Sequence, residues 1–132
     1  MRVMRNSSIA ALILTLLFTT LSFAAGLGDY VRAREFASRF TNVISVQGLT
    51  YTIGRNNADP MRLTVVSGSR DAYIGGIGGR KIKLERAAKV DLRGLLIPAS
   101  ALKLLGCRVA EQGKEILTTC NGKSYGLQRF VK

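Results

Sequence analysis

Two cysteines, Cys107 and Cys120, constrain the fold of this chain more than any other feature. Between them, two β-prone runs flank Gly113-Lys114, and a glycine in the first loop position is typical of a two-residue type II′ hairpin. If Gln112 faces Glu115 across that turn, the register places Cys107 directly opposite Cys120. Counting outward makes this a non-hydrogen-bonded pair, whose Cα atoms approach to about 4.5 Å, close enough for a disulfide.

We therefore predict a structural disulfide between Cys107 and Cys120. The chain-entropy estimate for closing such a loop is about 3 kcal/mol. One alternative is a pair of buried free thiols. The other is a catalytic thiol, which would need neighbours that lower its pKa. A disulfide persists in an oxidising compartment, so the cysteines also bear on location.

The first 24 residues indicate export. Arg2 and Arg5 form a short positive region, Ile9 to Leu21 is apolar apart from three threonines, and Ser22-Phe23-Ala24 has small residues where an export peptidase cuts. This pattern predicts a signal peptide, residues 1–24, and an exported protein that is periplasmic, envelope-associated or extracellular. The alternative is a retained anchor, because the apolar stretch reaches the lower end of the roughly 17–25 residues that span a bilayer.

Charge and missing residue types limit the function. The chain has 20 Lys plus Arg against 8 Asp plus Glu, and no His. Cleavage after residue 24 removes two arginines, leaving 18 basic and 8 acidic side chains, a net charge of +10 on 108 residues. Without His there is no imidazole base and no Ser-His-Asp triad, and two cysteines cannot form a four-thiolate zinc site. We expect no enzyme, no cofactor and no metal.

The middle of the chain reads as short β-prone runs separated by Gly, Asn, Asp or Ser. Connections this short favour antiparallel hairpins. The runs are Asn42–Val46, Leu49–Ile53, Arg62–Val66, Ala72–Ile74 and Arg80–Leu84.

A short helix interrupts these strands. Leu95-Leu96-Ile97 reads as a buried strand, Pro98 suits a first helical position and Gly106 suits a helix end. After the cysteine hairpin, an Asn121-Gly122 turn leads to a last strand, Ser124–Leu127. We expect an α+β fold: a small, mainly antiparallel β domain with one short inserted helix, over residues 42–132.

The segment 25–41 precedes that domain, and we expect a helix in it from Asp29 to Phe40. Ala33, Phe36, Ala37 and Phe40 fall on one helical stripe, and Asp29 can serve as N-cap. We expect this helix to pack on the sheet. The alternative is a free basic helix that lies on a membrane or a polyanion.

A resemblance to a known family lies between Arg62 and Leu127. It consists, in order, of a strand and turn, a second strand, an apolar strand that ends in proline, a helix end and a hairpin turn. These are Ala72-Tyr73-Ile74-Gly75-Gly76, Lys81-Ile82-Lys83-Leu84, Leu95-Leu96-Ile97-Pro98, Leu105-Gly106 and Asn121-Gly122-Lys123. The segment resembles the copper amine oxidase N-terminal-like (stalk) domain family of exported bacterial proteins, with Ser100 where that family usually has arginine. The resemblance implies a non-catalytic envelope module and, despite its name, no copper site.

Several short motifs look catalytic but lack their companions. Ser100-Ala101-Leu102-Lys103 has S-x-x-K spacing without S-D-N or K-T-G, and we interpret it as a helix start. Gly122-Lys123-Ser124 lacks the earlier glycine of a phosphate loop, and the glycines of residues 75–79 fit a hairpin connection better than a phosphate cradle. The acidic residues are too scattered to predict a paired-carboxylate glycosidase.

The basic run from Arg80 to Arg93 is the candidate binding feature. Its six basic residues, predicted to bind a polyanion, are Arg80, Lys81, Lys83, Arg86, Lys89 and Arg93. The alternative is a solvated strand edge whose lysines discourage aggregation. We expect a non-enzymatic exported module that contacts an anionic envelope polymer or an envelope protein. The second hypothesis is an exported nucleic-acid binder, although few aromatic residues are available to stack on bases.

Overall fold

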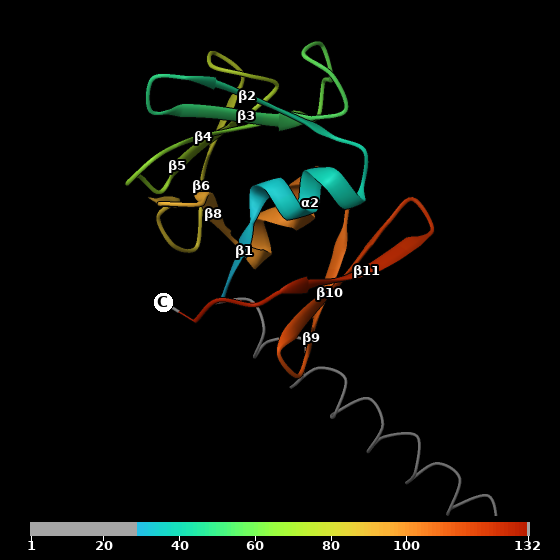
Figure 1. The fold of residues 1–132 in the computed structure, drawn as a ribbon. Helices are drawn as coiled ribbons and strands as arrows, with labels where there is room; N and C mark the ends of the chain where they lie inside the picture. The colour runs from blue at the N-terminus through green and yellow to red at the C-terminus, as the bar shows by residue number, and fades with distance from the viewer. Residues whose placement is uncertain (1–28, 132) are drawn as a thin grey trace, which may run out of the picture.

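The computed structural model describes residues 29–131, so the predicted signal peptide and its cleavage site lie outside the described residues. Between these bounds the chain forms eleven strands and two short helices, arranged as three antiparallel sheets (Figure 1). The mainly antiparallel β fold with a short inserted helix and a helix near the N-terminus is confirmed. No helix within this part of the chain is long and apolar enough to cross a membrane.

The first sheet is a five-stranded meander in chain order. Its strands are β2 (Val43–Gln47), β3 (Thr50–Gly54), β4 (Leu63–Val66), β5 (Asp71–Ile74) and β6 (Arg80–Lys83). They match the five predicted runs to within one residue at either end. The connections between them are too short for the crossover that parallel strands need, so neighbouring strands pair antiparallel. The strands β2 and β6 form the two edges of this sheet.

The second sheet has the order β1-β8-β7 and draws on distant parts of the chain. Its strands are β1 (Tyr30–Arg32), β7 (Lys89–Asp91) and β8 (Gly94–Pro98). The apolar strand β8 was expected, whereas β1 and β7 are short, partly charged strands that only the partner β8 makes recognisable. In addition to its pairing with β8, Tyr30 bridges to Phe130, with each backbone N–H donating to the other's carbonyl, at 2.8 and 2.9 Å.

The third sheet is the cysteine hairpin and its neighbour, in the order β11-β10-β9. Its strands are β9 (Arg108–Gln112), β10 (Glu115–Cys120) and β11 (Lys123–Gln128). Gln112 faces Glu115, so the predicted register is confirmed. The turn glycine Gly113 has φ 61°, as the first position of a type II′ turn requires.

The helix α2 (Ala33–Arg39) lies between the five-stranded sheet and the third sheet (Figure 1). Its predicted apolar stripe packs into the core, as expected, so it is not a free basic helix. The predicted start at Asp29 was wrong, because residues 30–32 are held extended by pairing with β8. Arg32 occupies the N-cap position without a capping hydrogen bond from its side chain, and Asp29 pairs with Arg129 instead.

The inserted helix, η1 (Ala99–Leu105), is a 3-10 helix. Pro98 precedes it as the last residue of β8, with extended φ −56° and ψ 140°, so its expected place as first helical residue was wrong. Gly106 ends the helix in the left-handed conformation, φ 84°, as predicted. Its residues Ala101 and Leu102 are buried.

A single apolar core joins all three sheets and both helices. Fully buried side chains come from β1, α2, the five-stranded sheet, β8, η1 and the cysteine hairpin. They include Val31, Phe36, Ile53, Leu63, Val65, Ile97, Leu102, Ile116 and Leu127. The segment 30–40 therefore packs into the same core as the strands that follow it.

Candidate functional site: surface cations and a cleft above the disulfide

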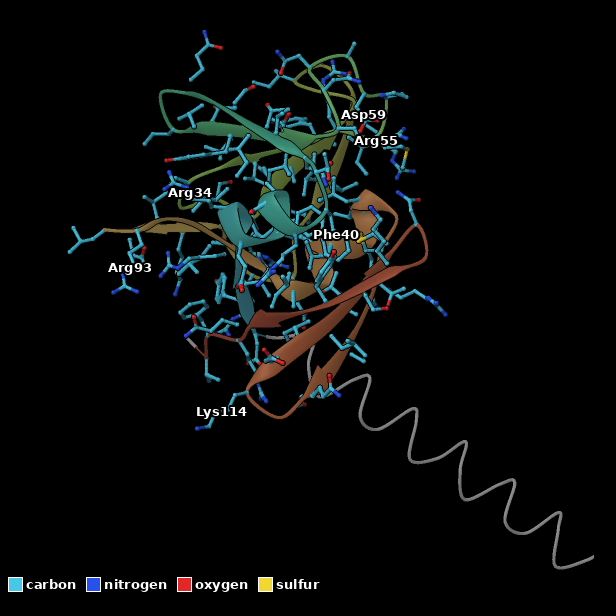
Figure 2. The ribbon with its side chains drawn as sticks, turned by 45° about the vertical axis from the view of Figure 1, so that its right-hand side comes forward. Arg34, Phe40, Arg55, Asp59, Arg93 and Lys114 are labelled. Atoms are coloured by element: carbon cyan, nitrogen blue, oxygen red, sulfur yellow. A yellow bond between two sulfur atoms is a disulfide. The ribbon has the colours of Figure 1, made fainter. Side chains whose placement is uncertain are left out.

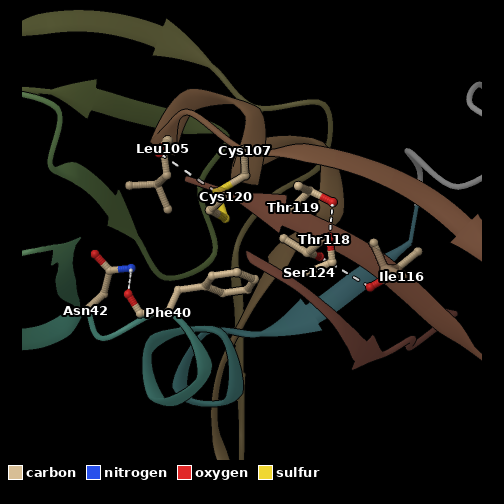
Figure 3. Close-up of a disulfide and its surroundings, with 9 residues drawn as sticks. All are labelled: Phe40, Asn42, Leu105, Cys107, Ile116, Thr118, Thr119, Cys120 and Ser124. Atoms are coloured by element: carbon tan, nitrogen blue, oxygen red, sulfur yellow. Dashed lines mark hydrogen bonds between the residues drawn. A yellow bond between two sulfur atoms is a disulfide. The ribbon is translucent and has the colours of Figure 1, made fainter. Parts of the chain in front are cut away.

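The predicted disulfide is confirmed. Cys107 and Cys120 are bonded, their Cα atoms are 4.5 Å apart, and both residues are buried. The bridge closes the open end of the β9–β10 hairpin, opposite the Gly113 turn. It lies beside the ring of Phe40, which follows α2, and below the end of η1 (Figure 3). Because both sulfurs are in the bond, neither cysteine offers a free thiol.

A cleft of about 480 Å³ opens above this bond, and we call it the disulfide cleft. Its apolar lining includes Phe40, Leu105 and the disulfide. Two cations from distant parts of the chain, Arg55 and Lys123, line it as well. Sequence reasoning missed this site because the β3–β4 loop, the end of α2 and the start of β11 meet only in the folded molecule.

Asp59 is the one carboxylate in the lining of the disulfide cleft, and its own loop holds it. Its Oδ2 accepts the Arg55 backbone N–H at 3.0 Å, and its Oδ1 accepts the Met61 N–H at 3.0 Å. These two bonds keep the pKa of Asp59 below its usual range. A carboxylate that is anionic and already bonded ties the loop together and is a poor proton acceptor.

Thr41 lies at the edge of the cleft in an unusual backbone conformation, φ 54°. It follows the helix C-cap Phe40, and the Asn42 N–H donates to the Ala37 carbonyl at 2.9 Å. This is the six-to-one bond of a Schellman motif, whose left-handed position is usually glycine. A β-branched residue there is strained.

The structure divides the predicted basic run into two groups on different sheets. Arg80, Lys81 and Lys83 are exposed on the edge strand β6. There Lys83 Nζ lies 2.5 Å from Asp71 Oδ1, and Lys81 Nζ lies 3.9 Å from Asp71 Oδ2. The hydrogen bond from Lys83 lowers the pKa of Asp71. This carboxylate offsets part of the positive charge of the edge.

Arg86 and Lys89 gather instead around the buried ring of Tyr30. Their charged groups lie 5.5 and 5.3 Å from the ring centroid, within the range of a cation–π interaction. The Tyr30 hydroxyl donates to the Ala87 carbonyl at 2.7 Å. The tyrosine therefore positions two of the predicted cations and is itself closed to a ligand.

Arg93, the last residue of the predicted set, is exposed in the turn between β7 and β8. Figure 2 places Arg93 and Arg34 on the same side of the molecule, away from Phe40, Arg55 and Asp59. Arg34 is exposed on α2 and was not among the predicted binding residues. Nearby, both oxygens of Asp91 are occupied by Arg32 at 2.8 Å.

Two further observations bear on chemistry. Within residues 29–131, no group of three or more His, Cys, Asp or Glu side chains is placed to hold a metal ion. Lys123 of the Gly122-Lys123-Ser124 sequence begins a strand, whereas a phosphate loop would lead into a helix. Comparison of the chain with protein-family models, curated proteins and solved structures finds no match in any of the three.

Proposed function

We propose that this chain is a non-enzymatic, exported binding module whose surface cations contact anionic cell-envelope material. The disulfide supports export, since such bonds persist in oxidising compartments. The resemblance to stalk domains of exported bacterial proteins supports a role without catalysis. An envelope protein with an acidic surface is the other partner that the same chemistry would attract.

The balance of charge carries this proposal. Five acidic side chains, Asp29, Asp59, Asp71, Asp91 and Glu111, are in ion pairs with five cations. Over residues 29–131 the chain carries seventeen basic side chains against eight acidic ones, a formal excess of nine positive charges. Such an excess attracts polyanions through the summed field, whatever the shape of the ligand.

Salt-dependent binding to isolated cell-wall sacculi that retain their anionic polymers tests the proposal. The exported, disulfide-bonded protein should bind at low salt and be released as salt rises, because screening acts over about 10 Å at 0.1 M ionic strength and about 3 Å at 1 M. Charge reversal of Arg34 and Arg93 together should weaken binding at least tenfold. Binding that persists at about 1 M salt, where exposed charges are screened, would overturn the proposal.

A matched pair of variants tests which cations matter. Lys81→Glu with Lys83→Glu should weaken binding less than the Arg34 and Arg93 pair does, because Asp71 already offsets those lysines. Asp71→Asn should strengthen binding by removing that carboxylate. Duplex DNA of equal charge concentration is the comparison ligand, and a clear preference for DNA would favour the nucleic-acid hypothesis instead.

A further inference from the structure

The strand β2 differs from every other strand at a sheet edge in the described part of the chain. Its residues, Val43-Ile44-Ser45-Val46-Gln47, include no charge and no proline. The other edge strands, β1, β6, β7, β9 and β11, each carry at least one Lys, Arg, Asp or Glu. Charged residues on an edge discourage pairing with another strand, so β2 alone lacks this protection.

The surroundings of β2 are apolar as well as uncharged. Val43 and Val46 are 47% and 59% exposed, and Leu49 in the adjoining turn is 67% exposed. Tyr51, directly opposite Val46 on β3, is only partly covered. Val43 and Val46 lie on opposite faces of β2, so this edge exposes apolar side chains on both faces of the sheet. Such an edge, with open backbone groups, is a surface to which a strand can be added.

The register of the β2–β3 hairpin defines which backbone groups are open. Gln47 and Thr50 close a two-residue turn, so they form a hydrogen-bonded pair, and the pattern then alternates along the strand. Val43 and Ser45 therefore also bond to β3. The N–H and C=O groups of Ile44 and Val46 point away from the sheet and have no strand beside them.

We infer that two copies of this chain associate through antiparallel pairing of β2 with β2. A two-fold axis at Ser45 sets Ile44 against Val46 of the other copy and Val46 against its Ile44, so that four backbone hydrogen bonds form. The same pairing brings these apolar side chains together on one face. The two five-stranded sheets then become one continuous sheet, an isologous interface in which each copy supplies the same patch.

A second copy fits this edge better than a charged partner strand. Two strongly basic chains repel each other over most of their surfaces. The strand β2 has no charged residue, so two copies can approach there with less repulsion. An acidic strand would find no cation on β2 to pair with. The inference does not depend on the proposed function, although a dimer would give an anionic polymer two contact sites, whose combined affinity exceeds that of one.

Cysteine substitution tests the register directly. Ser45→Cys should form a disulfide-linked dimer on mild oxidation, because residue 45 faces its own counterpart in a non-hydrogen-bonded pair about 4.5 Å away. Gln47→Cys is the matched control on the same strand and face. Its counterpart would lie four residues along, about 13 Å distant at 3.3 Å per residue, so it should not cross-link. Equal cross-linking of both variants, or of neither, would overturn the register.

Sedimentation of the unmodified chain tests association itself. The protein should show a concentration-dependent dimer, and Val46→Lys should reduce the association constant at least tenfold by placing a like-charge pair at the seam. Ile77→Lys is the control, since Ile77 is 71% exposed in the β5–β6 loop, away from β2. Circular dichroism should confirm that both variants fold. A chain that stays monomeric, or a dimer equally weakened by both substitutions, would refute the inference.

Discussion

Thr41 gives the sharpest test of how the backbone stores strain in this protein. It occupies the left-handed position after α2, its side chain is exposed, and it makes no hydrogen bond with the residues that the structure describes. The left-handed conformation costs an L-residue about 1–2 kcal/mol. Glycine avoids this cost, but its unfolded chain has greater conformational freedom, which lowers the stability by about 0.5–1 kcal/mol. Thr41→Gly should therefore stabilise the protein by about 0.5–1 kcal/mol.

The measurement is urea unfolding of the disulfide-bonded protein, followed by circular dichroism, together with a thermal scan. For a domain of this size the gain corresponds to a rise of about 3–6 °C in Tm. Ser38→Gly is the matched control, since Ser38 is exposed within α2, and there glycine should cost about 0.5 kcal/mol. A stability of Thr41→Gly equal to or below that of the unmodified protein would refute the strain argument. It would imply that the threonine side chain stabilises the fold by a contact.

Three further predictions concern the disulfide, acid stability and export. Replacing Cys107 and Cys120 with serine should lower the free energy of unfolding by about 3 kcal/mol, and unfolding curves that coincide with those of the unmodified protein would contradict it. The lowered pKa of Asp59 means that its stabilisation is complete above its unfolded pKa, about 3.9, and is lost as pH falls through the lower folded value. Asp59→Asn should therefore flatten the pH dependence of the urea midpoint below about pH 4. If the midpoint of the variant falls with pH as steeply as that of the unmodified protein, the ionised Asp59 does not stabilise the fold. Mass spectrometry of the exported protein should find Ala25 at the N-terminus, and retention of Met1 would indicate a membrane anchor.

The features that followed from the sequence are local ones. The Cys107–Cys120 disulfide could be predicted because a two-residue turn fixes the register of both flanking strands. The five strands of the meander could be predicted because turn residues separate them at short intervals. Local patterns were insufficient for β1, where an N-terminal segment with helical periodicity is held extended by β8.

The candidate site was less predictable because its contacts are distant in sequence. The residues that neighbour Arg129 in the sequence do not indicate that it forms ion pairs with both Asp29 and Glu111. In the same way, the sequence does not indicate that Asp71 lies across the β5–β6 ladder from Lys83, where it offsets part of the charge of the basic edge. Pairing across sheets depends on the assembled fold, so the sequence indicated an excess of cations without indicating which of them remain open.

The bridge between Tyr30 and Phe130 bears on the timing of folding. A chain emerges from a ribosome or a translocation pore in the N-to-C direction, so residue 30 appears first and waits for about a hundred residues before its partner arrives. The contacts of Asp29 with Arg129 wait equally long. Loop-closure entropy is paid before such contacts form, which slows the folding of topologies that depend on them. The contacts of Asp29 and Tyr30 with the C-terminal residues are therefore expected to form only after the chain has left the ribosome or the pore. Until then these contacts do not hinder passage of the chain through a pore.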